Sequence, residues 1–194
     1  MGFKDTESDH GVFIKRWEDR EFVVVDMHVN DCLSIGSSQG LVTEFKKKIN
    51  EKYKMTDLGP CKWLLGIKID HDLANGTLAL LQHTYIDSIV AQFNFDDLKP
   101  LVIPMDPAAL LLKSQSSSML VDITKMNHVP YQKAVDSLMY AAMGTRPDIA
   151  FATSTVAQFL KRAHWEAVKR IFQYLKETRN VSLVYGEKQK NLQG

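Results

Sequence analysis

Two short apolar runs with a polar break between them are the strongest structural constraint in this sequence. The run 22–29 is rich in β-branched residues, and the run 32–36 follows directly after Asn30 and Asp31. Apolar runs separated by two turn-forming residues are typical of a tight β-hairpin. The sequence therefore predicts two antiparallel strands, with Asn30 and Asp31 in the turn between them.

The same pattern is repeated further along the chain. Apolar residues at helical spacing predict a helix over about 39–54, with Ser38 as a suitable N-cap. Residues 63–69 are predicted to form one strand, and Asn75-Gly76 marks a second hairpin. A second helix is expected over 85–93. The order strand–strand–helix–strand–strand–helix, with antiparallel hairpins, indicates the α+β class.

A connector with many prolines and serines separates this region from a helical one. Residues 99–130 include Pro100, Pro104 and Pro107 and the run 114–118, in which four of five residues are serine. Connectors of this length mark a boundary between units or a functional loop. Beyond it, apolar stripes predict helices over 131–144 and around 165–175, followed by a short strand over 181–185.

Several side chains in the helical region carry specific predictions. Thr145 is expected to cap the helix that Pro147 opens, and Arg146 and Asp148 are expected to form a local ion pair. Met139 and Tyr140 are expected to lie in the core.

Composition narrows the functional classes. The chain of 194 residues has 24 Lys+Arg against 23 Asp+Glu, so any contact with nucleic acid must come from a local patch. No apolar run is long enough to cross a bilayer, so we expect no membrane partner and an intracellular location. The two cysteines, Cys32 and Cys61, lack the spacing of a metal site, and we expect no disulfide between them but small, buried apolar side chains.

Few residues stand out as candidates for chemistry. The sequence contains no P-loop, GxGxxG, HExxH or GxSxG motif. Polar groups at a hairpin tip can hold divalent metals, but Asn30 and Asp31 are also an ordinary turn pair. Lys46, Lys47 and Lys48 fit either a solvated helix face or a face that contacts phosphate.

Ordered sequence blocks resemble one known family along nearly the whole chain. The chain resembles the C-terminal half of the reverse transcriptase of copia-type LTR retrotransposons, most closely the fungal branch. The blocks that carry this resemblance are Gly2-Phe3 with Asp9 and Phe13, 25–36, Met55-Thr56-Asp57-Leu58-Gly59, 63–67, Lys99-Pro100 with 104–107, 129–131, 137–141, 144–150 and 164–170.

The resemblance implies a polymerase fold and a site. Residues 1–98 would be the C-terminal part of the palm, 99–130 the connector, and 131–194 a mainly helical thumb or connection region that ends before RNase H. The family turn holds two catalytic Mg²⁺ ions through two aspartates, and these positions are Asn30 and Asp31 here. The residues that would contact an RNA or DNA primer–template are His28 next to the turn and, in a primer-grip-like hairpin, Trp63, Leu64 and Gly66.

Departures from the family pattern lead to the functional prediction. Asn30 replaces a metal-binding carboxylate, and the family's third aspartate belongs to a segment before this chain begins. We therefore expect a truncated reverse transcriptase that has lost RNA-directed DNA synthesis, with cytoplasmic or nuclear location by family. The alternatives are a non-catalytic module that pairs with an intact Pol chain, or one that binds nucleic acid through Lys46–Lys48, Lys169 and Arg170.

Overall fold

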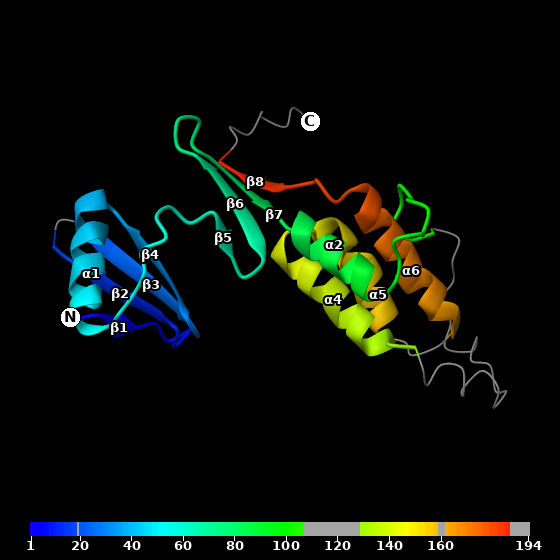
Figure 1. Cartoon of the computed structure of the whole chain (residues 1–194), viewed down its shortest axis with the longest axis horizontal. Coiled ribbons are helices and arrows are strands. Elements are labelled where there is room, and N and C mark those ends of the chain that lie inside the picture. Colours follow the sequence, from blue (N-terminus) through cyan, green and yellow to red (C-terminus); the bar gives the residue numbers. More distant parts are fainter. Residues whose placement is uncertain (19, 107–128, 159–161, 187–194) are drawn as a thin grey trace. The chain divides into compact units, whose positions relative to one another are not determined.

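The computed structural model describes residues 1–18, 20–106, 129–158 and 162–186, with the side chains of 162 and 163 left aside. The chain divides into two compact units, Met1–Cys61 (unit 1) and Lys62–Gly194 (unit 2). Figure 1 shows the helices and strands of both units, coloured from blue at the N-terminus to red at the C-terminus. The described part is α+β, with two antiparallel sheets and five α-helices.

Unit 1 is one sheet with one helix on it. Its strands, in the order β1-β2-β3-β4, are β1 (Lys4–Asp5), β2 (Val12–Arg16), β3 (Phe22–His28) and β4 (Asp31–Gly36). Helix α1 (Gln39–Lys52) follows, and the hydroxyl of its N-cap Ser38 accepts a hydrogen bond from the Leu41 amide. The predicted helix and N-cap are confirmed.

The core of unit 1 lies between the sheet and α1. Val23, Val25 and Phe45 are its buried apolar residues. The Phe45 ring meets Phe3 edge to face, with 5.3 Å between the ring centroids. Because neighbouring residues of a strand point to opposite faces, Val24 lies on the other face of β3.

Unit 2 also contains a four-stranded antiparallel sheet. Its order is β5-β6-β7-β8, formed by β5 (Trp63–Leu64), β6 (Ile67–Asp72), β7 (Thr77–Leu81) and β8 (Leu183–Tyr185). The predicted strand over 63–69 is wrong, because the chain reverses at Leu65 and Gly66. Both residues have positive φ, 50° and 77°, as a two-residue hairpin turn allows.

Helices make up the rest of unit 2. They are α2 (His83–Gln92), α4 (Tyr131–Gly144), the 3₁₀ turn η2 (Pro147–Ile149), α5 (Ala150–Ala157) and α6 (Arg162–Glu177). Leu138, Ile171 and Leu175 are among its fully buried residues, and the rings of Phe93 and Phe95 pack on Phe172. The predicted apolar stripes therefore do form the core.

The contacts divide the chain between Cys61 and Lys62. The division falls there because the second hairpin and α2 pack in unit 2, where β7 pairs with β8 and α2 contacts α6. The connector 99–130, predicted to be either a boundary between units or a functional loop, lies within unit 2, and the assignment of 1–98 and 131–194 to parts of a polymerase stays a prediction. Most of the connector, 107–128, lies outside the described residues.

No helix in the described ranges combines the length and apolar character needed to cross a bilayer.

Candidate functional site

The β3–β4 hairpin carries the predicted metal site. His28 pairs directly with Asp31, so the two turn residues are Val29 and Asn30. The prediction that Asp31 lies in the turn is therefore wrong: Asp31 is the first residue of β4. Val29 adopts φ 51°, an unusual conformation for a β-branched residue, and backbone strain of this kind is concentrated at functional sites.

The hairpin end is open to solvent but supplies few metal ligands. His28, Asn30 and Asp31 are all exposed. The donor groups here are one carboxylate, one amide and one imidazole, whereas two Mg²⁺ ions require several carboxylate oxygens. Within the described ranges, no group of three or more His, Cys, Asp or Glu side chains could hold a metal ion. The residues present therefore do not fit a two-magnesium centre by themselves.

One face of the unit 1 sheet carries no helix. Strand register places Ile14, Val24 and Ile35 side by side on this open face, with His28 and Asp31 further along it. No described element of unit 1 packs on these side chains, and Ile35 is about half exposed at 54%. An exposed apolar sheet face suits a partner, so pairing with another polymerase chain stays a prediction.

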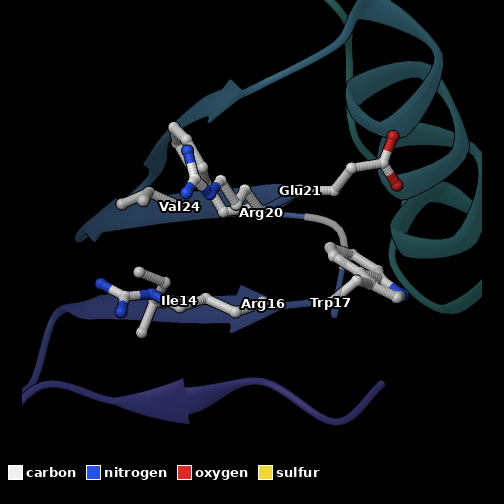
Figure 2. Close-up of a pocket in the computed structure, with 7 residues that line it drawn as sticks. Ile14, Arg16, Trp17, Arg20, Glu21 and Val24 are labelled. Carbon is white, nitrogen blue, oxygen red and sulfur yellow. The ribbon is translucent and has the colours of Figure 1, made fainter.

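A hollow of about 410 Å³ lies on the open face, at the end of β3 away from the turn. Ile14 and Val24 contribute apolar surface, and Arg16 and Arg20 contribute charge, as Figure 2 shows. The Lys15 ammonium lies 4.7 Å from the centroid of the Trp17 ring, which also lines the hollow. The hollow is thus separate from the His28–Asp31 hairpin end.

The lysine run of α1 is partly neutralised by carboxylates. The Lys46 ammonium lies 2.8 Å from the Asp57 carboxylate, and Lys48 pairs with Glu44 one helical turn away. Hydrogen bonds from Lys46 and from a backbone amide lower the pKa of Asp57. Lys47 is exposed and makes no ion pair with another described residue. Of these three lysines, Lys47 is therefore the one whose charge is fully available to phosphate among the described residues.

The second predicted contact surface lies on the β5–β6 hairpin. Trp63 is about half exposed at 51%, and its ring centroid lies 5.8 Å from that of His83. Leu64 is half-buried, and Gly66 closes the turn with open space where a Cβ would lie. An exposed indole beside an imidazole is a surface on which a nucleic-acid base can stack.

The predicted basic residues of α6 are less available. Lys169 pairs with Glu166 on its own helix, at 2.9 Å between the charged groups. Arg170 is half-buried, and its Nε has no hydrogen-bond partner among the described residues. These residues and the β5–β6 hairpin belong to unit 2, whereas His28, Asp31 and the lysine run belong to unit 1.

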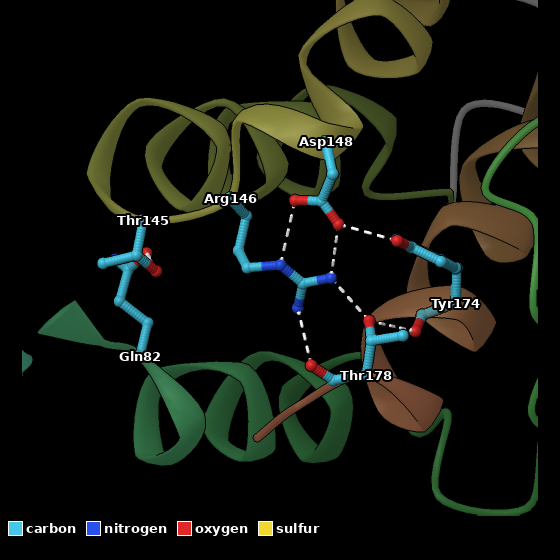
Figure 3. Close-up of polar contacts among 6 residues, drawn as sticks. All are labelled: Gln82, Thr145, Arg146, Asp148, Tyr174 and Thr178. Atoms are coloured by element: carbon cyan, nitrogen blue, oxygen red, sulfur yellow. Dashed lines mark hydrogen bonds and ion pairs between the residues drawn. The ribbon is translucent and has the colours of Figure 1, made fainter. Parts of the chain in front are cut away.

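The predicted ion pair between Arg146 and Asp148 is confirmed, and it is part of a buried polar network. Its side chain is fully buried, and its guanidinium donates to both carboxylate oxygens of Asp148 at 3.0 and 2.7 Å. It also donates to the Thr178 carbonyl at 3.0 Å, and the Tyr174 hydroxyl donates to Asp148 at 2.7 Å. Figure 3 shows how this network joins the turn after α4 to the end of α6.

Thr145 does not cap the following helix, contrary to the prediction. Its hydroxyl instead donates to the Gln82 side chain at 2.8 Å, and both residues are buried. The residue preceding η2 is Arg146, which makes no side-chain capping bond, while Pro147 does open the turn.

Met139 and Tyr140 lie outside the core, contrary to the prediction. They are 43% and 38% exposed, and the Tyr140 hydroxyl donates to the Leu65 carbonyl in the β5–β6 turn. For Tyr140 the helical periodicity contained the necessary signal, because it follows Leu138 of the buried stripe by two positions and falls on another side of α4. Met139 follows Val135 by four positions, so it lies at the margin of that stripe, where periodicity does not decide its exposure.

Comparisons with known proteins agree with these features. The sequence profile of the family described as "Reverse transcriptase (RNA-dependent DNA polymerase)" matches residues 1–107. The "Retrovirus-related Pol polyprotein from transposon TNT 1-94" of Nicotiana tabacum is 36% identical over 97% of this chain and 14% of its own length. The "Putative transposon Ty5-1 protein YCL074W" of Saccharomyces cerevisiae is 29% identical over 95% of this chain and 58% of its own length.

A plant relative from Arabidopsis thaliana, the "Retrovirus-related Pol polyprotein from transposon RE1", is 31% identical over 93% of this chain and 12% of its own length. The chain thus spans about an eighth of the two plant polyproteins and just over half of the yeast protein. The tobacco protein is more similar than the yeast one, so these comparisons do not favour the fungal branch. No solved structure matches. The family profile and the polyprotein relatives together place this chain in the reverse transcriptase family of copia-type retrotransposon Pol polyproteins.

Proposed function

We propose that this chain is a non-catalytic form of the reverse transcriptase palm and thumb, in which the metal-binding hairpin is incomplete. The observation that carries the proposal is the side chain of Asn30 at the β3–β4 turn, next to Asp31. Replacing a carboxylate with an amide removes one negative charge beside the expected Mg²⁺ ions. Each loss of about 1.4 kcal/mol in transition-state stabilisation lowers a rate tenfold.

The assignment of parts is a proposal of the same kind. Unit 1, which carries the β3–β4 hairpin, would supply the palm sheet, and the β5–β6 hairpin would grip the primer terminus. Helices α4 to α6 would correspond to the thumb or connection region. The strained turn at Val29 and the exposed ring of Trp63 support these two roles.

Restoring the carboxylate should strengthen metal binding without restoring synthesis. In Asn30→Asp, we expect Mn²⁺ affinity at the hairpin to rise at least about tenfold, equivalent to ~1.4 kcal/mol. Paramagnetic broadening of the Asp31 amide signal measures this affinity. Primer extension on an RNA template with Mg²⁺ should stay absent, because one restored carboxylate still leaves too few ligands for two ions.

Two variants control this experiment. Asn30→Ala tests whether removing the amide alone changes metal affinity, and Asn30→Asp combined with Asp31→Asn returns the hairpin to one carboxylate. Primer extension by the unchanged chain would refute the proposal of a non-catalytic chain. Synthesis that is gained in Asn30→Asp and lost again in the double variant would instead show that Asn30 alone accounts for the loss, and would contradict the expectation that one restored carboxylate leaves too few ligands.

A second candidate function is nucleic-acid binding without catalysis, which the exposed Trp63 ring favours. We expect weak binding of a primer–template duplex that falls steeply with salt.

Lys47→Gln should reduce the slope of log K against log salt by about 1, as for one lost phosphate contact. Lys48→Gln is the matched control and should change the slope less, because Glu44 already pairs with Lys48. Fluorescence anisotropy between 50 and 200 mM salt checks this; equal slopes for all three proteins would contradict it.

A further inference from the structure

Two tyrosines of unit 2 form a pair that joins three elements. The rings of Tyr85 on α2 and Tyr140 on α4 meet edge to face, with 4.8 Å between centroids. The Tyr85 hydroxyl donates to the Ser137 carbonyl at 3.1 Å, within the helical bundle. The Tyr140 hydroxyl donates to the Leu65 carbonyl, outside the bundle. One hydroxyl therefore connects helix to helix, and the other connects a helix to the β5–β6 turn.

The turn that Tyr140 contacts needs external support. Leu65 has φ 50°, and a non-glycine residue in the left-handed region costs of order 1 kcal/mol or more. Strand β5 has only two residues, Trp63 and Leu64, so few backbone bonds hold the turn in place. A hydrogen bond to the Leu65 carbonyl is well placed to stabilise this left-handed backbone conformation against an opened turn.

The conformation of the Leu65–Gly66 turn also determines where the Trp63 ring lies. Trp63 is directly opposite Lys68 across the hairpin, and its ring is tilted by 49° against that of His83. If the two-residue turn opens, β5 separates from β6, and the indole leaves this position. The path of contacts thus runs from the Tyr140 hydroxyl through the Leu65 carbonyl to Trp63.

We infer that Tyr140 is a positioning residue, which fixes the Leu65–Gly66 turn so that the β5–β6 hairpin presents Trp63 to a nucleic-acid strand. The positioning of the hairpin follows from contacts within unit 2. The nucleic-acid ligand rests on the proposed function, so the experiment has one measurement for each part.

The experiment compares Tyr140→Phe with Tyr85→Phe in the full chain. Both changes remove one hydroxyl and keep the ring pair, but only the first removes the bond to the turn. The Ile69 amide reports on the hairpin, because it donates to the Lys62 carbonyl at 2.8 Å. The Thr145 amide, which donates to Ala141 at 3.2 Å, reports on whether the end of α4 remains folded.

We expect hydrogen exchange at Ile69 to become about two- to tenfold faster in Tyr140→Phe, the effect of losing one hydrogen bond. Exchange at Thr145 should stay unchanged, and Tyr85→Phe should leave exchange at Ile69 within about twofold of wild type. The affinity for a labelled primer–template duplex, measured by anisotropy at low salt, should fall by a similar two- to tenfold factor only in Tyr140→Phe.

The outcomes separate the two parts. Unchanged exchange at Ile69 in Tyr140→Phe, or an equal increase in both variants, would overturn the positioning role. Faster exchange at Ile69 with unchanged duplex affinity would uphold the positioning role and refute nucleic-acid contact by the hairpin. Faster exchange with reduced affinity, absent from Tyr85→Phe, supports both.

Discussion

Replacing Arg146 with methionine should lower the free energy of unfolding of unit 2 by about 3 kcal/mol, at the low end of the range for breaking a buried ion pair. The change removes both Arg146 hydrogen bonds and the positive charge from the Asp148 carboxylate, which keeps only the Tyr174 hydroxyl as a side-chain donor among the described residues. It also removes the Arg146 donor from the Thr178 carbonyl. The Asp148 side chain is 35% exposed, so water replaces part of the lost hydrogen bonding. Urea unfolding followed by circular dichroism measures the effect.

Two controls distinguish the ion pair from simple packing. Arg146→Lys keeps the charge but lacks the planar fork that donates in parallel to Asp148 while also reaching the Thr178 carbonyl, so it should remain clearly destabilised. Arg146→Met combined with Asp148→Leu removes both charges and should recover much of the stability. A stability of Arg146→Met within about 0.5 kcal/mol of wild type, the usual range for a surface change, would contradict the structural role of this network.

The pH dependence of wild type provides a further check on the same network. Burial raises the pKa of Asp148, but hydrogen bonds from Arg146 and Tyr174 and the Arg146 charge outweigh it, so the pKa lies below its ordinary value. A carboxyl with a lowered folded-state pKa contributes stability above its unfolded pKa of about 3.9, and this contribution is lost as pH falls through the folded pKa. The acid-dependent loss should therefore be smaller in Arg146→Met than in wild type.

Replacing Phe45 with alanine should unfold unit 1. Phe45 is one of three buried residues in its core, and removing a buried phenylalanine costs about 3–5 kcal/mol. A unit of 61 residues buries only about 60% of its unfolded surface and is marginally stable. Hydrogen exchange of the β3 amides should therefore approach the unfolded rate.

The open face of the same sheet provides the control. Val24→Ala removes an apolar side chain from β3 on the face without a helix, and it should cost less than about 1 kcal/mol because little contact is lost. Protected β3 amides in Phe45→Ala would show that unit 1 does not depend on this small core.

The helices were predictable because their apolar faces follow a local period. Val168, Ile171 and Leu175 are all fully buried on α6, as their spacing indicated. The turns were less predictable, since they depend on strand pairing. Val29 is a poor turn residue by composition, yet the pairing of His28 with Asp31 places it there. Likewise, Leu65 and Gly66 lie within an apolar run that reads as one strand, and only the family resemblance indicated a hairpin there.

Contacts between distant segments could not be predicted from the sequence either. The burial of Arg146 depends on Thr178, 32 residues further along the chain, and the bond of Tyr140 reaches back 75 residues to Leu65. No local pattern encodes such partners. The candidate site was identified from its likeness to a family, because the residue types alone left Asn30 and Asp31 as an ordinary turn pair.

The pairing of β7 with β8 has a consequence for synthesis on the ribosome. Leu80 of β7 pairs with Leu183 of β8, so the sheet of unit 2 stays incomplete until nearly all of the described chain has been made. Unit 1 has all its strands once residue 61 has emerged. During translation, therefore, the nascent β6–β7 hairpin exposes an unpaired backbone edge. Such an edge can recruit strands from other chains, which makes unit 2 the part of the molecule most in need of a chaperone.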